Sequence, residues 1–94
     1  MYFGTVVGDV VSTHKNERLE GKRLLLTRRL SLDMKPEGPE IICLDVVDAG
    51  VGDKVLVVQE GSSARKIFGD DWIPVQAVIV GVLDRVDLHG RQVL

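Results

Sequence analysis

Hydrophobic residues in this chain come in short runs, separated by polar segments that contain glycine or proline. The runs cover residues 2–12, 23–28, 41–47, 54–59 and 75–86. Runs of this kind that end at turn residues are typical of β-strands. Sixteen valines against three alanines strengthen this interpretation, because β-branched side chains favour the pleated surface of a sheet. The pattern therefore predicts five strands in a mostly β domain.

The segments between the first four runs predict the connections. Residues 14–22 are polar and end in Glu-Gly-Lys, which indicates a broad hairpin between the first two strands. Residues 31–40 contain two prolines among charged residues, so we expect an exposed loop there and no central strand or helix. Residues 48–53 predict a turn in which Gly50 and Gly52 can adopt positive φ.

The segment between the fourth and fifth runs predicts one short helix. Ser62 or Ser63 can cap this helix, because a serine oxygen accepts a hydrogen bond from the first turn, and Gly69 can end it. The predicted fold is therefore all-β: a small five-stranded, OB-like β-barrel with one short helix between strands 4 and 5, in a single domain of residues 1–94. Residues 87–94 fit either a short additional strand or packing on a partner.

The last run is apolar on both of its alternating faces. One face can fill the barrel interior, and the other face, which carries Val78, Val80 and Val82, then needs a cover. A chain of 94 residues has a small core of its own, so a neighbouring copy is the expected cover. These three valines are the candidate subunit interface.

Composition and charge disfavour several classes of protein. The net charge is −2, so no overall positive field attracts the phosphates of nucleic acids. The single cysteine, Cys43, cannot form an internal disulfide, and no apolar run approaches the roughly 20 residues of a membrane span. The first residues lack the basic and long apolar regions of a signal peptide, so a cytoplasmic protein is expected.

One stretch of the sequence carries a specific signature. Residues 45–65 combine an acidic residue, an Ala-Gly-x-Gly turn, a second acidic residue, a hydrophobic strand and the motif Gly-Ser-Ser-Ala-Arg. Residues 8–26 and 74–81 add matches to a first hairpin and to a last strand. In this order the three segments resemble the EutN/CcmL family of bacterial microcompartment shell proteins.

The resemblance implies a structural protein rather than an enzyme. Members of that family form pentamers that close the fivefold vertices of polyhedral shells around metabolic enzymes, next to hexameric shell proteins. The family's Ala-Gly turn lies near the fivefold axis, so the resemblance makes Asp48, Ala49 and Gly50 the expected pore residues. The chain departs from the family at Asp48, where glycine is usual, and at Gln76, where aspartate is usual. Five Asp48 carboxylates around a small opening would disfavour anions.

The motif at residues 62–65 allows two interpretations. Ser62, Ser63 and Arg65 can form a helix cap with a solvated arginine. They can also contact an adjoining shell protein, because the family's motif lies near the pentamer rim and a guanidinium group can donate to several carbonyl groups. Both interpretations stay open at this point.

The sequence contains no complete motif for a catalytic site or a metal site. The motif at 61–65 lacks the final glycine of a nucleophile elbow, and only His14 and His89 could serve a catalytic triad. The His, Cys and Asp residues lack paired ligand spacing, and the Ala-Gly-x-Gly turn lacks the Gly-Lys-Ser/Thr end of a phosphate loop. Cys43 lies in an apolar run, where a small buried side chain is expected. We therefore predict no catalytic residue, metal or cofactor.

A single-stranded nucleic-acid-binding module is the alternative function. OB-like barrels bind single strands through stacked aromatic side chains beside basic groups. The chain offers two modest basic groups, the pair at 28–29 and the group of Arg18, Lys22 and Arg23. Its aromatic residues are not interleaved with these basic ones, however, and the net charge is acidic. The shell role is therefore favoured, and no nucleic-acid partner is expected.

Overall fold

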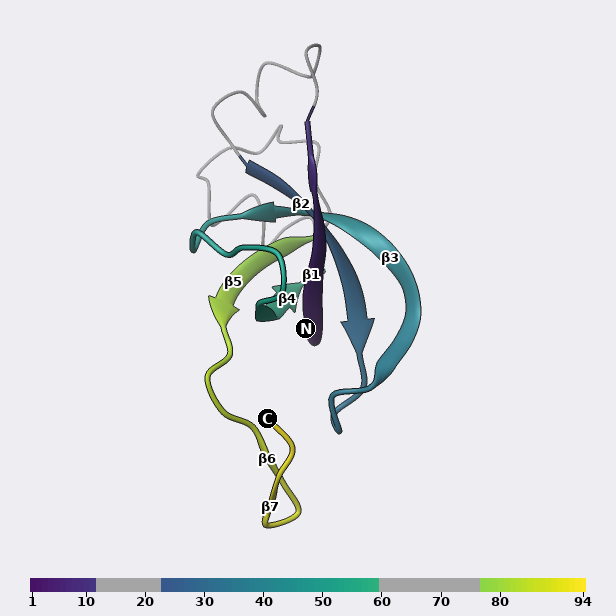
Figure 1. Ribbon diagram of the computed structural model, residues 1–94, viewed down its shortest axis with the longest axis vertical. Helices are drawn as coiled ribbons and strands as arrows, with labels where there is room; N and C mark the ends of the chain where they lie inside the picture. Colours follow the sequence, from purple (N-terminus) through teal and green to yellow (C-terminus); the bar gives the residue numbers. More distant parts are fainter. Residues whose placement is uncertain (12–22, 60–76) are drawn as a thin grey trace.

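A computed structural model describes residues 1–11, 23–59 and 77–94 (Figure 1). Within these ranges no helix is long and apolar enough to span a membrane. The helix that the sequence predicts after residue 61 lies outside the described residues. The described part of the chain contains seven strands: β1 (Tyr2–Val10), β2 (Arg23–Leu30), β3 (Pro36–Asp45), β4 (Lys54–Val58), β5 (Val78–Val82), β6 (Asp87–Leu88) and β7 (Arg91–Gln92).

The first five strands form a closed barrel with the order β1-β2-β3-β5-β4. All neighbouring pairs are antiparallel except β3 and β5, which pair in parallel at Leu44 and Asp45. β1 completes the cylinder by pairing with β4, from Tyr2 opposite Val57 to Thr5 opposite Lys54. The all-β, five-stranded barrel predicted from the hydrophobic runs is therefore confirmed.

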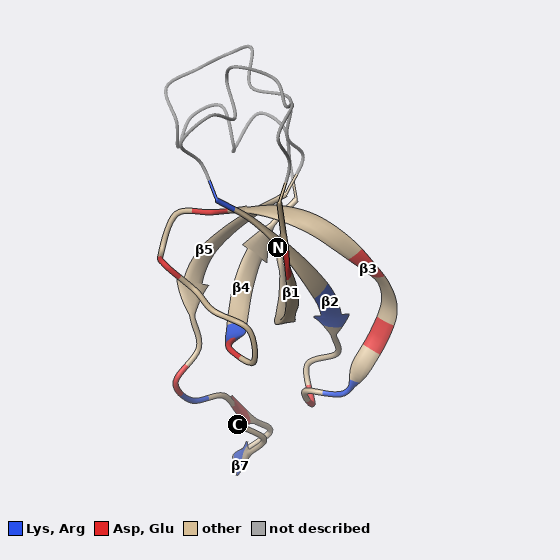
Figure 2. Ribbon diagram, turned by 45° about the horizontal axis from the view of Figure 1, so that its top comes forward, with Lys and Arg blue, Asp and Glu red and all other residues tan. Residues whose placement is uncertain are grey.

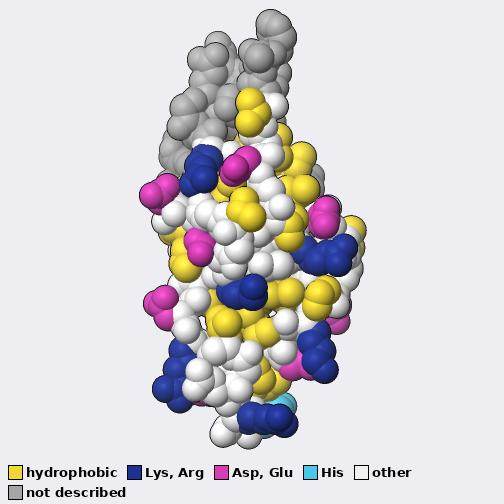
Figure 3. Space-filling view, viewed as in Figure 1, with side chains coloured by type: hydrophobic (Ala, Val, Ile, Leu, Met, Phe, Trp, Pro, Cys, Tyr) yellow, Lys and Arg dark blue, Asp and Glu magenta, His cyan; other side chains and the backbone are white. Residues whose placement is uncertain are grey.

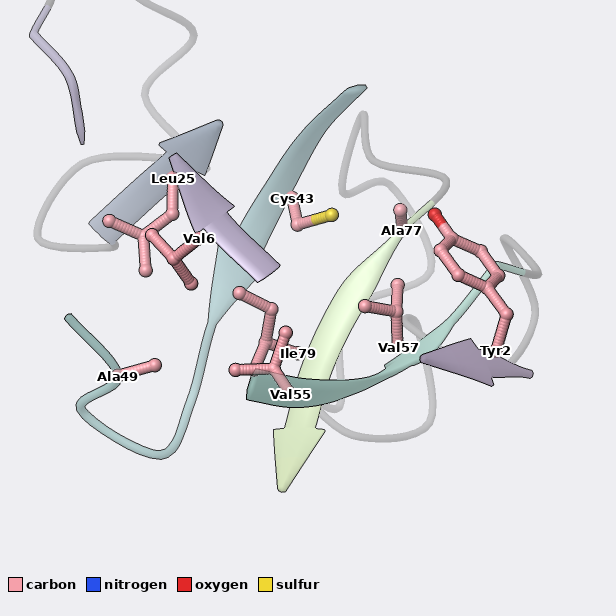
Figure 4. Close-up of a cluster of buried hydrophobic side chains, with 9 residues drawn as sticks. All are labelled: Tyr2, Val6, Leu25, Cys43, Ala49, Val55, Val57, Ala77 and Ile79. Atoms are coloured by element: carbon pink, nitrogen blue, oxygen red, sulfur yellow. The ribbon is translucent and has the colours of Figure 1, made fainter. Parts of the chain in front are cut away.

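The barrel interior is filled by alternate residues of its strands (Figure 4). In β1, for example, Val6 is 1% exposed, whereas the next residue, Val7, is 40% exposed. This period of two is the signature of a strand with one buried face. The core contains Tyr2, Val6, Leu25, Cys43, Ala49, Val55, Val57, Ala77 and Ile79.

Two core residues illustrate the environment inside the barrel. Burial raises the pKa of the Tyr2 phenol to about 12, with a further contribution from Cys43, and the Arg29 guanidinium lies 4.7 Å from the centre of the Tyr2 ring. Cys43 is fully buried and free, and burial raises the pKa of its thiol. The prediction that Cys43 is a small buried side chain is confirmed.

The expectation of a loop throughout residues 31–40 is wrong, because β3 begins at Pro36. The connection from β2 is the short turn of residues 31–35, in which the Ser31 N–H donates to the Lys35 carbonyl over 2.8 Å. β5 pairs with β3 only at Leu44 and Asp45, the last two residues of β3, so the first half of β3 has one free edge. Proline has no backbone N–H to donate to a neighbouring strand, so it is tolerated in an edge strand or as the first residue of a strand.

The fifth strand is shorter than the predicted run, and the tail forms structure of its own. β5 ends at Val82, and β6 and β7 then form a separate two-stranded hairpin below the barrel (Figure 1). Its two turn residues, His89 and Gly90, have φ values of 53° and 75°. Two consecutive positive φ values are the mark of a type I′ turn, which suits the twist of a tight hairpin. Of the two options for the tail, the structure shows the strand.

Candidate functional site

The loop between β3 and β4, residues 46–53, contains the signature turn and is organised by Asp45. The Asp45 side chain is 1% exposed. Its Oδ1 accepts a hydrogen bond from the Val47 N–H over 3.1 Å, and its Oδ2 accepts one from the Ala49 N–H over 2.9 Å. A carboxylate that accepts from backbone N–H groups two and four residues later fixes a tight turn. The first acidic residue of the signature therefore has a structural role.

The second acidic residue, Asp53, fixes the other half of the loop. Its Oδ2 accepts a hydrogen bond from the Gly50 N–H over 2.8 Å, and its own N–H donates to the Gly50 carbonyl over 3.0 Å. The Val6 N–H donates to the Asp53 carbonyl, and the Gly52 N–H donates to the Val6 carbonyl. The loop is thereby joined to β1 and held at both of its ends.

Arg23, the first residue of β2, connects the loop to the barrel wall. Its Nη1 donates to the Ala49 carbonyl over 2.7 Å and to the Asp48 Oδ1 over 3.2 Å. The Asp45 Oδ2 lies 3.6 Å from Nη1, and the Asp9 Oδ1 lies 3.6 Å from Nη2. In Figure 2 the basic start of β2 lies beside the acidic end of β3. One cation thus faces three carboxylates, and the cluster keeps a negative excess.

The three predicted pore residues have different environments. The Asp48 side chain is 96% exposed, whereas Ala49 is fully buried in the barrel core and Gly50 is partly buried. Positive φ occurs at Gly52, at 95°, and at Asp48, at 59°, but not at Gly50. Only Asp48 therefore presents a side chain to solvent, while Ala49 anchors the loop. That these residues line a pore stays a prediction.

The positive φ at Asp48 leads to a testable expectation for stability. A residue with a Cβ pays roughly 1 kcal/mol for the left-handed conformation, and glycine pays none. Replacing Asp48 by glycine or by alanine removes the exposed ion pair with Arg23, which contributes little to stability, so the two variants differ mainly in the backbone cost. We therefore expect Asp48→Gly to be about 1 kcal/mol more stable towards urea than Asp48→Ala. Equal unfolding midpoints for the two variants would contradict this account of the turn.

The predicted interface valines are not equivalent within one chain. Val78 is fully buried, Val80 is partly exposed and Val82 is 41% exposed. The register between β4 and β5 shifts, from Val57 opposite Ile79 to Leu56 opposite Gly81, so Val80 is an extra residue in a β-bulge. The simple alternation behind the predicted stripe does not continue through this bulge. The interface role stays a prediction, and Val78 has no free surface to contribute to it.

Ser62, Ser63 and Arg65 lie outside the described residues, so their shell contact also stays a prediction. In the ranges that the structure describes, no three His, Cys, Asp or Glu side chains gather in a group that could hold a metal ion. A cleft of about 490 Å³ between the tail hairpin and the β2–β3 turn contains none of the predicted site residues.

Sequence reasoning missed the role of Arg23. The sequence shows an arginine at the start of a strand, and nothing in its own segment indicates a partner. The structure places Arg23 directly opposite Asp45 in the β2–β3 ladder, and that register brings it to the loop. The sequence did contain a signal for the role of Asp45. Aspartate often begins a turn by accepting hydrogen bonds from backbone N–H groups a few residues later, and Asp45 lies four residues before Ala49.

Comparison with known proteins connects this loop and barrel to a group of relatives. Residues 1–84 match the sequence profile described as "Ethanolamine utilisation protein EutN/carboxysome". The bacterial microcompartment shell vertex protein GrpN of Rhodospirillum rubrum is 44% identical over 87 residues, which cover 93% of this chain and 97% of GrpN.

Solved structures share the fold over the same extent. The structure named "GrpN pentameric microcompartment shell protein from Rhodospirillum rubrum" is 42% identical, with a TM-score of 0.82, and the match covers 94% of this chain and 99% of that one. The structure of Gloeobacter violaceus CcmL is 33% identical, with a TM-score of 0.90, and covers 100% of this chain and 96% of that one. The similarity therefore includes the signature loop and the barrel that supports it.

Proposed function

This chain belongs to the EutN/CcmL family, and we propose that five copies of it form a ring that closes a vertex of a bacterial microcompartment shell in the cytoplasm. The observation that carries the proposal is the 42% identity to a solved pentameric shell protein over 94% of the chain. Relatives named as shell vertex proteins include the carboxysome protein CcmL of Synechocystis, at 40% identity. The names of these relatives support a structural role for the chain.

The mechanism of closure is geometric. A flat layer of hexagonal tiles cannot close into a polyhedron without pentagonal positions. A subunit that contacts its neighbour through two different surfaces forms a closed ring when the rotation between copies returns to the start. A closed barrel with a fixed loop is a suitable unit, because it has few free strand edges and a defined shape. In this role the ring adjoins hexameric shell proteins.

The negative excess of the cluster around Arg23 sets the charge that the proposed pore would have. If the loop faces the fivefold axis, the ring presents five exposed Asp48 carboxylates, each within 3.2 Å of an Arg23 nitrogen. Arg23 lowers the local negative charge but does not remove it, since Asp9 and Asp45 share the same cation. The opening therefore disfavours anions, and a cation bound on the axis is expected to be lost in Asp48→Gly.

The relatives favour the shell role over the nucleic-acid alternative. The first test is the native mass of the purified protein in solution. A ring of five chains of 10.3 kDa has a mass of about 52 kDa. That mass, followed by co-assembly with a hexameric shell protein into closed particles, would support the proposal. A monomer that binds single-stranded DNA in a salt-sensitive way would overturn it.

The shell contact of Arg65 has its own prediction. Arg65→Ala is expected to leave the ring of five intact but to leave shells open at their vertices, because the guanidinium donors to the adjoining protein are lost. The measurement is the fraction of closed particles by electron microscopy after co-expression with a hexameric shell protein. Arg65→Lys keeps the charge but not the planar donor array, so we expect a partial defect. If shells with Arg65→Ala closed normally, the contact role would be excluded and the helix-cap interpretation of this motif would remain.

A further inference from the structure

The cleft between the tail hairpin and the β2–β3 turn lies below the barrel (Figure 1). The turn contributes Asp33 and Lys35 to its lining, and the hairpin contributes residues of β6, β7 and the turn between them. Its volume of about 490 Å³ is in the range of pockets that bind small molecules, roughly 300–1,000 Å³. None of the described residues of the signature loop lines it, so the proposed vertex role does not use this cleft.

The hairpin directs one of its two arginines to the cleft. Leu88 and Arg91 are directly opposite each other in the β6–β7 ladder, so their side chains lie on the same face of the hairpin. Both line the cleft. Asp87 belongs to the other face, and its Oδ2 lies 3.2 Å from the Arg85 Nε. Arg85 therefore has a carboxylate partner outside the cleft, whereas Arg91 faces the cleft and has no such partner among the described residues.

The β2–β3 turn holds a second cation on the opposite wall. The Lys35 N–H donates to the Ser31 Oγ over 3.2 Å, and the Lys35 carbonyl accepts from the Ser31 N–H over 2.8 Å, so the backbone at Lys35 is fixed. The Lys35 Nζ lies 3.8 Å from the Asp33 Oδ2, and Asp33 also accepts a hydrogen bond from the Ser31 hydroxyl. With Arg91, the cleft has two cations and one carboxylate, a positive excess in a chain of net charge −2.

Apolar side chains lie beside these charges. Leu88 and Val93 line the cleft and are partly buried. Figure 3 shows basic side chains beside the histidine at the lower end of the molecule, and His89 also lines the cleft. A guanidinium and an ammonium group bind carboxylate or phosphate oxygens, and aliphatic side chains bind an apolar body. A ligand that matches both parts of the lining is a small organic anion.

We propose that this cleft binds a small organic anion, whose carboxylate or phosphate group contacts Lys35 and Arg91 and whose apolar part contacts Leu88 and Val93. The ligand joins two elements that are otherwise separate. β6 and β7 pair only with each other, and no hydrogen bond or ion pair between described residues links the hairpin to the β2–β3 turn. Binding is therefore expected to hold the tail against the barrel. The site lies within one chain, so the inference does not depend on the proposed function.

The test follows the methyl NMR signals of Leu88 and Val93 while benzoate is added to the full chain. Benzoate combines a carboxylate with an apolar body, so saturable shifts of both signals are expected. Arg91→Gln is expected to raise the dissociation constant about tenfold or more, because glutamine lacks the charge and the planar array of donors. Arg85→Gln is the matched control, since it removes the arginine of the same tail that lies outside the cleft, and it should leave the constant unchanged.

Two results would overturn the site. One is the absence of saturable shifts in the unmodified chain. The other is an equal effect of the two arginine substitutions, which would mean that benzoate responds only to the general charge of the tail. If the methyl spectrum without benzoate shows that Arg91→Gln disturbs the hairpin, Lys35→Gln replaces it. This variant removes the cation of the other wall and leaves Asp33 without its ammonium partner, so weaker binding is expected, and unchanged binding would contradict the proposal.

Two further ligands test the chemistry of recognition. Benzyl alcohol keeps the apolar body without the charge, and binding as tight as that of benzoate would overturn the anion site. Phenyl phosphate carries the other oxyanion. Whichever of phenyl phosphate and benzoate binds more tightly assigns the site to phosphates or to carboxylates, and both results support it. The native mass of the same sample keeps the two proposals apart: a monomer that binds benzoate overturns only the proposed ring, and a ring of five that does not bind benzoate overturns only this site.

Discussion

Replacing Asp45 by alanine is expected to lower the free energy of unfolding by about 3 kcal/mol and to release the β3–β4 loop. The Asp45 carboxylate is 1% exposed and accepts hydrogen bonds from the Val47 and Ala49 N–H groups. Alanine leaves both partly buried donors without a partner and creates a small void. It also removes one carboxylate beside the Arg23 guanidinium.

Urea unfolding measures the change in stability, and hydrogen exchange at Val47 and Ala49 measures the release of the loop. Asp45→Asn is the matched control, since the amide keeps one acceptor oxygen, and its effect should lie between those of the native residue and alanine. Because Ala49 belongs to the barrel core, the Asp45→Ala variant should also lose protection in neighbouring core residues. A loss of stability below about 1 kcal/mol would mean that the loop is held mainly by Arg23 and Asp53.

Gly4→Ala is expected to destabilise the barrel by about 2 kcal/mol. Gly4 lies in β1 opposite Arg29, with its missing side chain directed inward. A Cβ at this position would lie 2.6 Å from the Thr27 Cγ2 and 3.2 Å from the Arg28 carbonyl oxygen. Thr27 is fully buried, so it has little room to move, and the strands would have to separate.

A double-mutant cycle isolates this steric cause. Thr27→Ser removes the Cγ2 atom and keeps the hydroxyl group, so Gly4→Ala should cost clearly less in the Thr27→Ser background than in the native one. The coupling between the two positions is expected to be about 1 kcal/mol, measured by urea unfolding of the four proteins. Additive effects would show that the contact with Thr27 is not the reason for glycine at this position.

The sequence predicted the barrel well because its signal is local. Each strand is a short apolar run that ends at turn residues, and the signature around residues 45–65 fixes the order of the last elements. The local signal fails at a β-bulge, where two residues of one strand lie opposite a single residue of the next strand. The bulge at Val80 interrupts the alternation in β5, and a period-two pattern carries no information about such an extra residue.

Proline was the second source of error. The rule that prolines exclude a strand holds for central strands, and residues 36–40 were therefore expected to be a loop. Whether a strand is central depends on where its neighbours end, which is a property of the assembled sheet. β5 reaches only Leu44 and Asp45, so the first half of β3 is an edge and accepts Pro36 and Pro39.

The candidate site was predicted in part. The exposed Asp48 follows from its position in the turn, but the burial of Ala49 and the role of Arg23 depend on long-range pairing. Arg23 and Ala49 are 26 positions apart, and only the β2–β3 register brings the guanidinium within 2.7 Å of the Ala49 carbonyl. No local pattern encodes such a contact.

The late position of β5 in the chain has a consequence for synthesis on the ribosome. β5 is the last barrel strand to be made, so the cylinder stays open while β1 to β4 already exist, and β3 then exposes its second edge along its whole length. Nascent chains on neighbouring ribosomes could join through such edges and aggregate. Pro36, Gly38 and Pro39 oppose this pairing over the half of β3 that β5 never covers. The residues that weaken the strand pattern therefore guard an edge that is free both during translation and in the finished barrel.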